Sequence, residues 1–197
     1  MRKILTQGQK DKKIRRNQWI IGLILIGLMI FGTLGYAFSG REDENSEKIE
    51  YNGIEFIKAN EYWNFNLQGY DFITKYNPQE TENISFLSYS SINNYASKPL
   101  YLVSDFNEPS YEISRNLNPF VSRINGACLS EDCNNDLPIK NCSVDNIIII
   151  QEPENENGNK EDIKESIYQQ DNCIFITSGI ENQTRYVDAF LFKILGI

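Results

Sequence analysis

The chain has 197 residues, of which 41% are hydrophobic and 23% are charged, and its formal net charge at pH 7 is −8. It contains no histidine, which excludes Ser-His-Asp triads, HExxH zinc sites, Cys-His protease pairs and histidine-ligated metals. The GxxxxGK[ST] and GxGxxG loops that cradle nucleotide phosphates are also missing.

The N-terminal region combines a basic segment with a long apolar one. Residues 1–18 carry seven Lys or Arg against one Asp, residues 19–38 carry no charge, and residues 41–197 carry twelve Lys or Arg against twenty-six Asp or Glu. At about 1.5 Å per residue, a helix over 19–38 covers the roughly 30 Å of a bilayer core. Basic residues collect on the cytoplasmic side, so we expect a single-pass transmembrane helix with residues 1–18 as a cytoplasmic tail and the C-terminal domain outside the cell.

A cleaved secretory signal is the alternative, because Ala37, Phe38 and Ser39 loosely match a small-x-small cleavage site. The apolar run exceeds the roughly 7–15 residues usual in a signal peptide, which favours a retained anchor in the lipid bilayer. The basic tail lacks aromatic residues and the remainder of the chain is acidic, so we expect no nucleic-acid partner.

Residues 39–48 are polar and charged and are expected to form a juxtamembrane linker, followed by one exterior domain over 49–197. Two β-hairpins are predicted at its start, with turns at Asn52-Gly53 and Gln68-Gly69 that place apolar side chains on one face. The predicted opposite pairs are Tyr51 and Ile54, Ile49 and Phe56, Leu67 and Tyr70, Phe65 and Phe72, Trp63 and Thr74, and Asn66 and Asp71.

Twelve aromatic residues lie between Tyr51 and Tyr101, and a glycan-binding platform is one interpretation. The predicted hairpins place most of the aromatic residues that they contain on the core-facing side, which favours packing instead. The platform would require four tyrosines to cluster on the exposed face, namely Tyr62, Tyr76, Tyr89 and Tyr95.

A strand is predicted over 100–104, and an apolar helical face follows over 113–124. Pro119 interrupts this helix and Asn118 can cap a second helical piece, so we expect a break near residue 118. Four consecutive isoleucines at 147–150 predict a strand that is buried on both faces.

Twenty-one residues separate this strand from the next apolar one, 172–177. Ile163 and Ile167 lie four residues apart within 160–169, which favours a short crossover helix and a parallel pair of strands. A hairpin with a long acidic loop is the alternative.

An apolar stripe over 187–195 predicts a C-terminal helix that packs on the sheet, with Ser178 and Glu181 as a capping box. The expected fold class is therefore α+β: an N-terminal transmembrane helix followed by one exterior domain with antiparallel hairpins, a mixed sheet and packed helices.

The four cysteines, Cys128, Cys133, Cys142 and Cys173, all lie in the predicted exterior domain, where oxidising conditions favour disulfides. We favour Cys128–Cys133, which share one polar loop, and Cys142–Cys173. A four-cysteine zinc site is the alternative, but the cysteine spacing lacks CxxC-like knuckles, and thiol oxidoreductase chemistry also lacks its CxxC motif.

The acidic segment 151–162 does not match a calcium loop, because Pro153 would occupy the first ligand position before Gly158. No catalytic residue, cofactor or metal ligand is indicated. We expect a cell-surface protein whose exterior domain binds or scaffolds an envelope or surface protein. The alternative is an anchored carboxylate-dependent enzyme that acts on glycans or cell-wall polymers.

The runs CLSEDCNNDLPIKNCSVDNIIII, DNCIFITSG and DAFLFKILGI resemble the C-terminal part of uncharacterised single-pass membrane proteins from archaea with reduced genomes. The resemblance covers roughly the last seventy residues. It implies an exterior surface domain and no catalytic activity.

Overall fold

A computed structural model describes residues 18–29 and 47–197, apart from 85, 87–89, 106, 132, 134, 135 and 154–164. The chain divides into two units, 1–46 and 47–197, and each is described by itself. In the first unit residues 18–29 form a helix, whereas the predicted tail before it, the second part of the predicted span and nearly all of the linker lie outside the described residues. Among the described helices, none has the length and apolar character needed to cross a bilayer.

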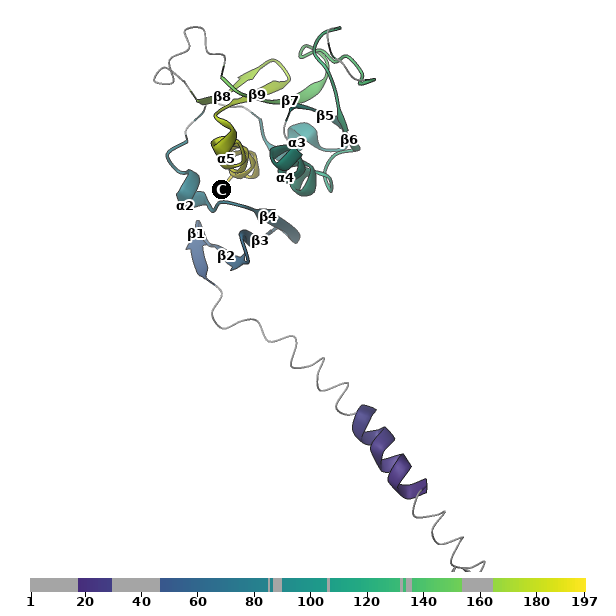
Figure 1. Cartoon of the computed structure of the whole chain (residues 1–197). Helices are drawn as coiled ribbons and strands as arrows, with labels where there is room; N and C mark the ends of the chain where they lie inside the picture. Colours follow the sequence, from purple (N-terminus) through teal and green to yellow (C-terminus); the bar gives the residue numbers. More distant parts are fainter. Residues whose placement is uncertain are drawn as a thin grey trace, which may run out of the picture. The chain divides into compact units, whose positions relative to one another are not determined.

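The second unit is an α+β domain, as the sequence predicts, and its elements form three layers (Figure 1). A four-stranded meander forms one outer layer, helices α4 and α5 form the middle, and a five-stranded mixed sheet forms the other outer layer. The strands are β1 (Lys48–Tyr51), β2 (Ile54–Ala59), β3 (Tyr62–Leu67), β4 (Tyr70–Thr74), β5 (Pro99–Ser104), β6 (Arg123–Gly126), β7 (Asn146–Gln151), β8 (Ser166–Gln170) and β9 (Cys173–Thr177). The helices are α2 (Pro78–Thr81), α3 (Ile92–Tyr95), α4 (Asn107–Leu117) and α5 (Gln183–Leu195).

The meander is antiparallel throughout, and every residue pair predicted for its two hairpins is present. Both turns need left-handed backbone at two consecutive positions, which Asn-Gly and Gln-Gly supply. The φ angles are 50° at Asn52, 77° at Gly53, 54° at Gln68 and 87° at Gly69. The predicted register is therefore confirmed.

Aromatic side chains join the meander to α5. Phe56, Trp63, Phe65 and Phe72 are buried on the inner face of the meander and form one cluster with Phe192 of α5. The Phe65 ring lies 5.2 Å from the Phe72 ring and 5.9 Å from the Phe192 ring, which suits offset and tilted aromatic pairs. The meander thus packs on the helical layer by apolar contact.

The second sheet has the strand order β6-β5-β7-β9-β8, with β8 antiparallel to β9 and the other pairs parallel. Its central strand β7 carries the four isoleucines, and all four are buried as predicted. Ile148 and Ile150 pack in the core that α4 and α5 cover, whereas Ile147 and Ile149 belong to a cluster with Tyr101 on the other face.

Two predictions for this region are wrong. Helix α4 ends at Leu117 as the Pro119 break requires, but Ile124 belongs to strand β6, which pairs in parallel with β5, and not to a second helical piece. Of the helix expected over 160–169, residues 160–164 lie outside the described residues, and 166–170 form strand β8 instead. Ile167 faces the core and the next residue, Tyr168, is exposed, which is the alternation of a strand. The parallel pairing of β7 with β9 is confirmed, so the alternative antiparallel hairpin of these two strands does not form.

Helix α5 packs on the mixed sheet as predicted, through Val187, Phe190, Leu191 and Ile194. The predicted capping box is wrong, since a 3₁₀ turn over Ile180–Asn182 precedes α5 and the Ser178 hydroxyl has no hydrogen-bond partner within the described part of the chain. The carboxylate of Glu165 instead accepts hydrogen bonds from the Gly179 N–H and the Asn182 amide, both at 2.9 Å.

Candidate functional site

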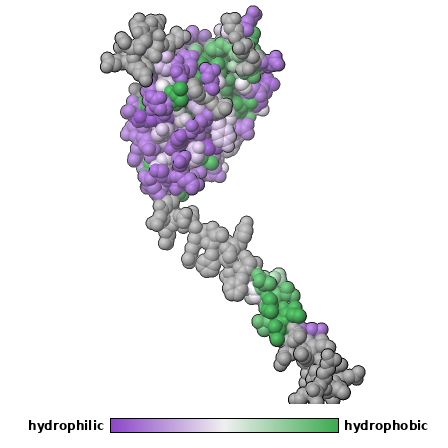
Figure 2. All heavy atoms as spheres, in the orientation of Figure 1, coloured by the Kyte–Doolittle hydropathy of each residue, from purple (hydrophilic) through white to green (hydrophobic). Residues whose placement is uncertain are grey.

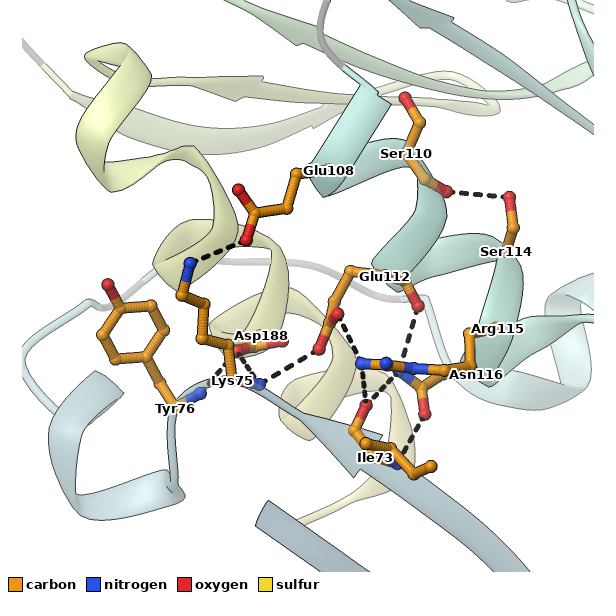
Figure 3. A network of polar contacts seen from close by, with 10 residues as sticks. All are labelled: Ile73, Lys75, Tyr76, Glu108, Ser110, Glu112, Ser114, Arg115, Asn116 and Asp188. Carbon is orange, nitrogen blue, oxygen red and sulfur yellow. Dashed lines mark hydrogen bonds and ion pairs between the residues drawn. The ribbon is translucent and has the colours of Figure 1, made fainter. Parts of the chain in front are cut away.

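Polar side chains meet where the last strand of the meander runs past α4 and α5 (Figure 3). Strand β4 pairs with β3 along one edge, and its other edge has no strand partner among the described strands. Side chains of the two helices instead form hydrogen bonds with the N–H and carbonyl of Ile73 and with the N–H of Lys75, just after the strand. We call the set Ile73, Lys75, Glu112, Arg115, Asn116 and Asp188 the polar junction.

Asn116 binds β4 as a neighbouring strand would. Its Oδ1 accepts a hydrogen bond from the Ile73 N–H at 2.9 Å, and its Nδ2 donates to the Ile73 carbonyl at 2.8 Å. Asn116 and Glu112 are four residues apart on α4 and therefore share one face of the helix. The adjacent face carries Ile113 and Leu117, which are fully buried in the core, so the packing of α4 sets the position of both polar side chains.

Glu112 and Asp188 converge on the chain just after β4. The Lys75 N–H lies 3.1 Å from Glu112 Oε1 and 3.1 Å from Asp188 Oδ2. The Tyr76 N–H donates to the same Asp188 oxygen at 2.9 Å. Glu112 is 2% exposed and Asp188 is not exposed at all, so both carboxyls are removed from water.

Arg115 is the cation of the junction. Its Nη2 lies 2.5 Å from Glu112 Oε2 and donates to the Ile73 carbonyl at 2.9 Å. Its guanidinium also lies over the rings of Tyr62 and Tyr111, at 4.9 and 5.5 Å from their centroids. These contacts keep a charge next to Glu112, whereas Asp188 has no ion pair in the described part of the chain.

Burial raises the pKa of the Glu112 carboxyl, although the positive charge of Arg115 opposes this effect. Burial, and secondarily the nearby charge of Glu112, raises the pKa of Asp188 well above that of an ordinary aspartate. The two acids thus differ in their surroundings: Glu112 has the cation Arg115 beside it, whereas Asp188 faces the backbone N–H groups of Lys75 and Tyr76 and the carboxyl of Glu112.

A second polar cluster lies on the opposite face of the mixed sheet, beside the disulfides. Arg123 Nη2 donates to the Tyr101 hydroxyl at 2.8 Å, and Lys140 Nζ lies 4.2 Å from the centre of the Tyr101 ring and 3.2 Å from Asp145 Oδ1. Hydrogen bonds from Lys140 and then Arg123 hold the pKa of Tyr101 below its usual value.

The structure joins Cys128 to Cys133 and Cys142 to Cys173, with Cα atoms 6.0 and 5.1 Å apart. This is the pairing favoured from the sequence, and it leaves none of the four cysteines as a free thiol for zinc or for thiol exchange. The longer bridge ties the segment that carries Lys140 to the start of β9.

The tyrosines proposed for a glycan platform do not cluster on an exposed face. Tyr95 is buried in the core, Tyr62 and Tyr76 are half-buried, and Tyr89 lies outside the described residues. Most aromatic residues of the meander pack inward, as predicted, although Tyr70 is 48% exposed.

The described surface of the domain has a groove of about 230 Å³ beside α2 and a groove of about 520 Å³ on the outer face of the meander. Neither is lined by Glu112 or Asp188. Within the described residues, no group of three or more cysteine and acidic side chains is placed to hold a metal ion.

The junction residues were not singled out by the sequence. One signal was available: Asp188 is a single acid within the apolar helix sequence VDAFLFKIL, and a charge at such a position needs buried partners.

Compared with known proteins, the chain matches no family model, no curated protein and no solved structure. The resemblance to archaeal membrane proteins therefore stays a prediction.

Proposed function

We propose that the chain is a single-pass cell-surface protein, with a cytoplasmic N-terminus and an exterior α+β domain that binds or scaffolds another envelope component. The observation that carries this proposal is the pair of disulfides in the folded domain. Disulfides persist in oxidising surroundings outside the cytoplasm and are rare within it. The basic segment 1–18 and the uncharged segment 19–38 support an anchor with the domain outside.

The surface of the disulfide-bridged segment supports a binding role. Four aliphatic side chains are exposed there, by 42% for Leu129, 39% for Leu137, 56% for Ile139 and 78% for Val144. Figure 2 shows hydrophobic residues gathered at the end of the domain where β5, β6 and β7 lie in Figure 1. Apolar surface on a covalently constrained segment loses little conformational freedom when a partner buries it.

A topology experiment tests the anchor. The full chain, tagged at its C-terminus, is expressed in cells, and externally added protease should remove the tag from intact cells. The protein should stay in the membrane fraction during a high-salt wash, and its intact mass should include residues 1–38. A mature protein that begins at Gly40 would support the cleaved signal instead, and a protease-protected tag would overturn the proposed orientation.

A binding experiment tests the proposed binding or scaffolding role of the exterior domain. The full chain should co-purify from mild detergent extracts with a stoichiometric protein partner. Replacing Ile139 and Val144 by Asp should abolish co-purification, while Ile180→Asp, an equally exposed isoleucine elsewhere on the domain, should not. A chain that remains a lone monomer in every extract would count against a scaffolding role.

The alternative, an anchored enzyme that uses two carboxyls, gains no support from the polar junction. Glycosidase carboxyls must reach the scissile bond from a cleft. Glu112 and Asp188 are buried and bind backbone N–H groups of the meander, so their position serves the packing of the domain.

A further inference from the structure

We propose that Glu112 and Asp188 share one proton and form a pH-sensitive latch, which holds the meander to helices α4 and α5 while the proton is bound and loosens when it is lost. This device goes beyond the proposed surface role and does not depend on it. It concerns the buried acids of the polar junction.

The geometry brings the two acids together at one donor. Because the Lys75 N–H lies 3.1 Å from an oxygen of each carboxyl, these oxygens cannot be more than about 6 Å apart, a range in which like charges strongly perturb each other. Asp188 is fully buried, and its second oxygen, Oδ1, has no hydrogen-bond partner in the described part of the chain. An ionised carboxylate with one such oxygen would be costly to bury, whereas a neutral carboxyl buries no charge.

The charged groups around Glu112 and Asp188 can neutralise one carboxylate but not two. The positive charge of Arg115 neutralises the carboxylate of Glu112. Lys75 Nζ and Glu108 pair with each other at 2.6 Å on the surface, and Tyr76 contributes its backbone N–H. With the proton on Asp188, this carboxyl donates a hydrogen bond to ionised Glu112, which also accepts from Lys75 and Arg115.

Loss of the proton to water leaves two carboxylates and one cation in a site without solvent. Repulsion then acts between α4 and α5 at the point where both hold the chain after β4. The aromatic cluster around Phe192 is unaffected, so the meander stays attached and its edge opens locally. The latch is most stable below the ordinary pKa of an aspartate and weakens as pH rises toward the raised pKa of the pair.

Hydrogen exchange on the full chain in detergent tests the latch, with a peptide that covers residues 71–77. After correction for intrinsic exchange, protection of the Lys75 and Tyr76 amides should fall as the pH rises above the ordinary pKa of an aspartate, by up to about tenfold per pH unit. In Asp188→Asn the side chain cannot ionise, so protection should not change with pH. Glu108→Gln, on the same helix but exposed, should keep the pH dependence of the unmodified chain.

Protection that is constant with pH in the unmodified chain, or that falls equally in Asp188→Asn, would overturn the proposal. A second measurement uses only the unmodified chain, so its result does not depend on whether the variants fold. Carbon NMR of labelled aspartate carboxyls should show one that is still protonated at a pH where ordinary aspartates are ionised, and its absence would refute the shared proton.

Discussion

Asn116→Ala should destabilise the domain by about 2–4 kcal/mol. The substitution removes the partner of the Ile73 N–H, and a buried unsatisfied donor costs about 1–3 kcal/mol. It also removes the hydrogen bond to the Ile73 carbonyl, worth about 1 kcal/mol, although Arg115 still donates to that oxygen. Asn116 is 3% exposed, so water cannot readily replace the lost amide without local rearrangement.

Urea unfolding of the non-reduced chain, followed by circular dichroism, measures this loss. Ser114→Ala is the matched control, because Ser114 lies on the same helix and its hydroxyl donates only to the Ser110 carbonyl one turn earlier. The control should change stability by less than about 1 kcal/mol, since alanine is the better helix former. If the two variants unfold within about 0.5 kcal/mol of each other, Asn116 does not act as the strand partner inferred here.

Three further outcomes are expected. Replacing both Cys142 and Cys173 by Ala should lower the free energy of unfolding by about 3–4 kcal/mol in the same assay, and removing the shorter bridge should lower it by about 2 kcal/mol. The difference arises because a disulfide removes more entropy from the unfolded chain when it closes a longer loop. Equal losses would contradict this ranking. Gln183→Met should stabilise the domain by about 1–2 kcal/mol, since the nitrogen and oxygen of the Gln183 amide are buried without hydrogen-bond partners in the described part of the chain. A destabilised variant would show that the amide does have a hydrogen-bond partner. Lys140→Met should raise the pKa of Tyr101, measured by ultraviolet titration, and an unchanged titration would remove Lys140 as the main cause.

The hairpins of the meander were predictable because their information is local. Asn52-Gly53 and Gln68-Gly69 select the turns, and the alternation of apolar residues beside each turn leaves one register that buries them together. The buried strand β7 was predictable for a similar reason, since four successive isoleucines suit only a site that is covered on both faces.

The polar junction was not predictable, because its pairs join residues far apart in the chain. Asn116 and Glu112 look like ordinary polar positions of an amphipathic helix, and their partners Ile73 and Lys75 contribute backbone groups that any residue type would offer. Strand β6 was missed for a related reason, since Ile124 continues the helical spacing of α4 and only its pairing with β5 decides otherwise.

The capped edge of β4 also affects how the protein behaves toward copies of itself. An exposed strand edge can recruit an extended segment from another molecule and so start aggregation. Here the amide of Asn116 occupies the outward groups of Ile73, and two carboxyls occupy the N–H of Lys75 just after the strand, so the edge offers no template for strand addition at these positions. Such protection would keep neighbouring domains from pairing through this stretch of β4.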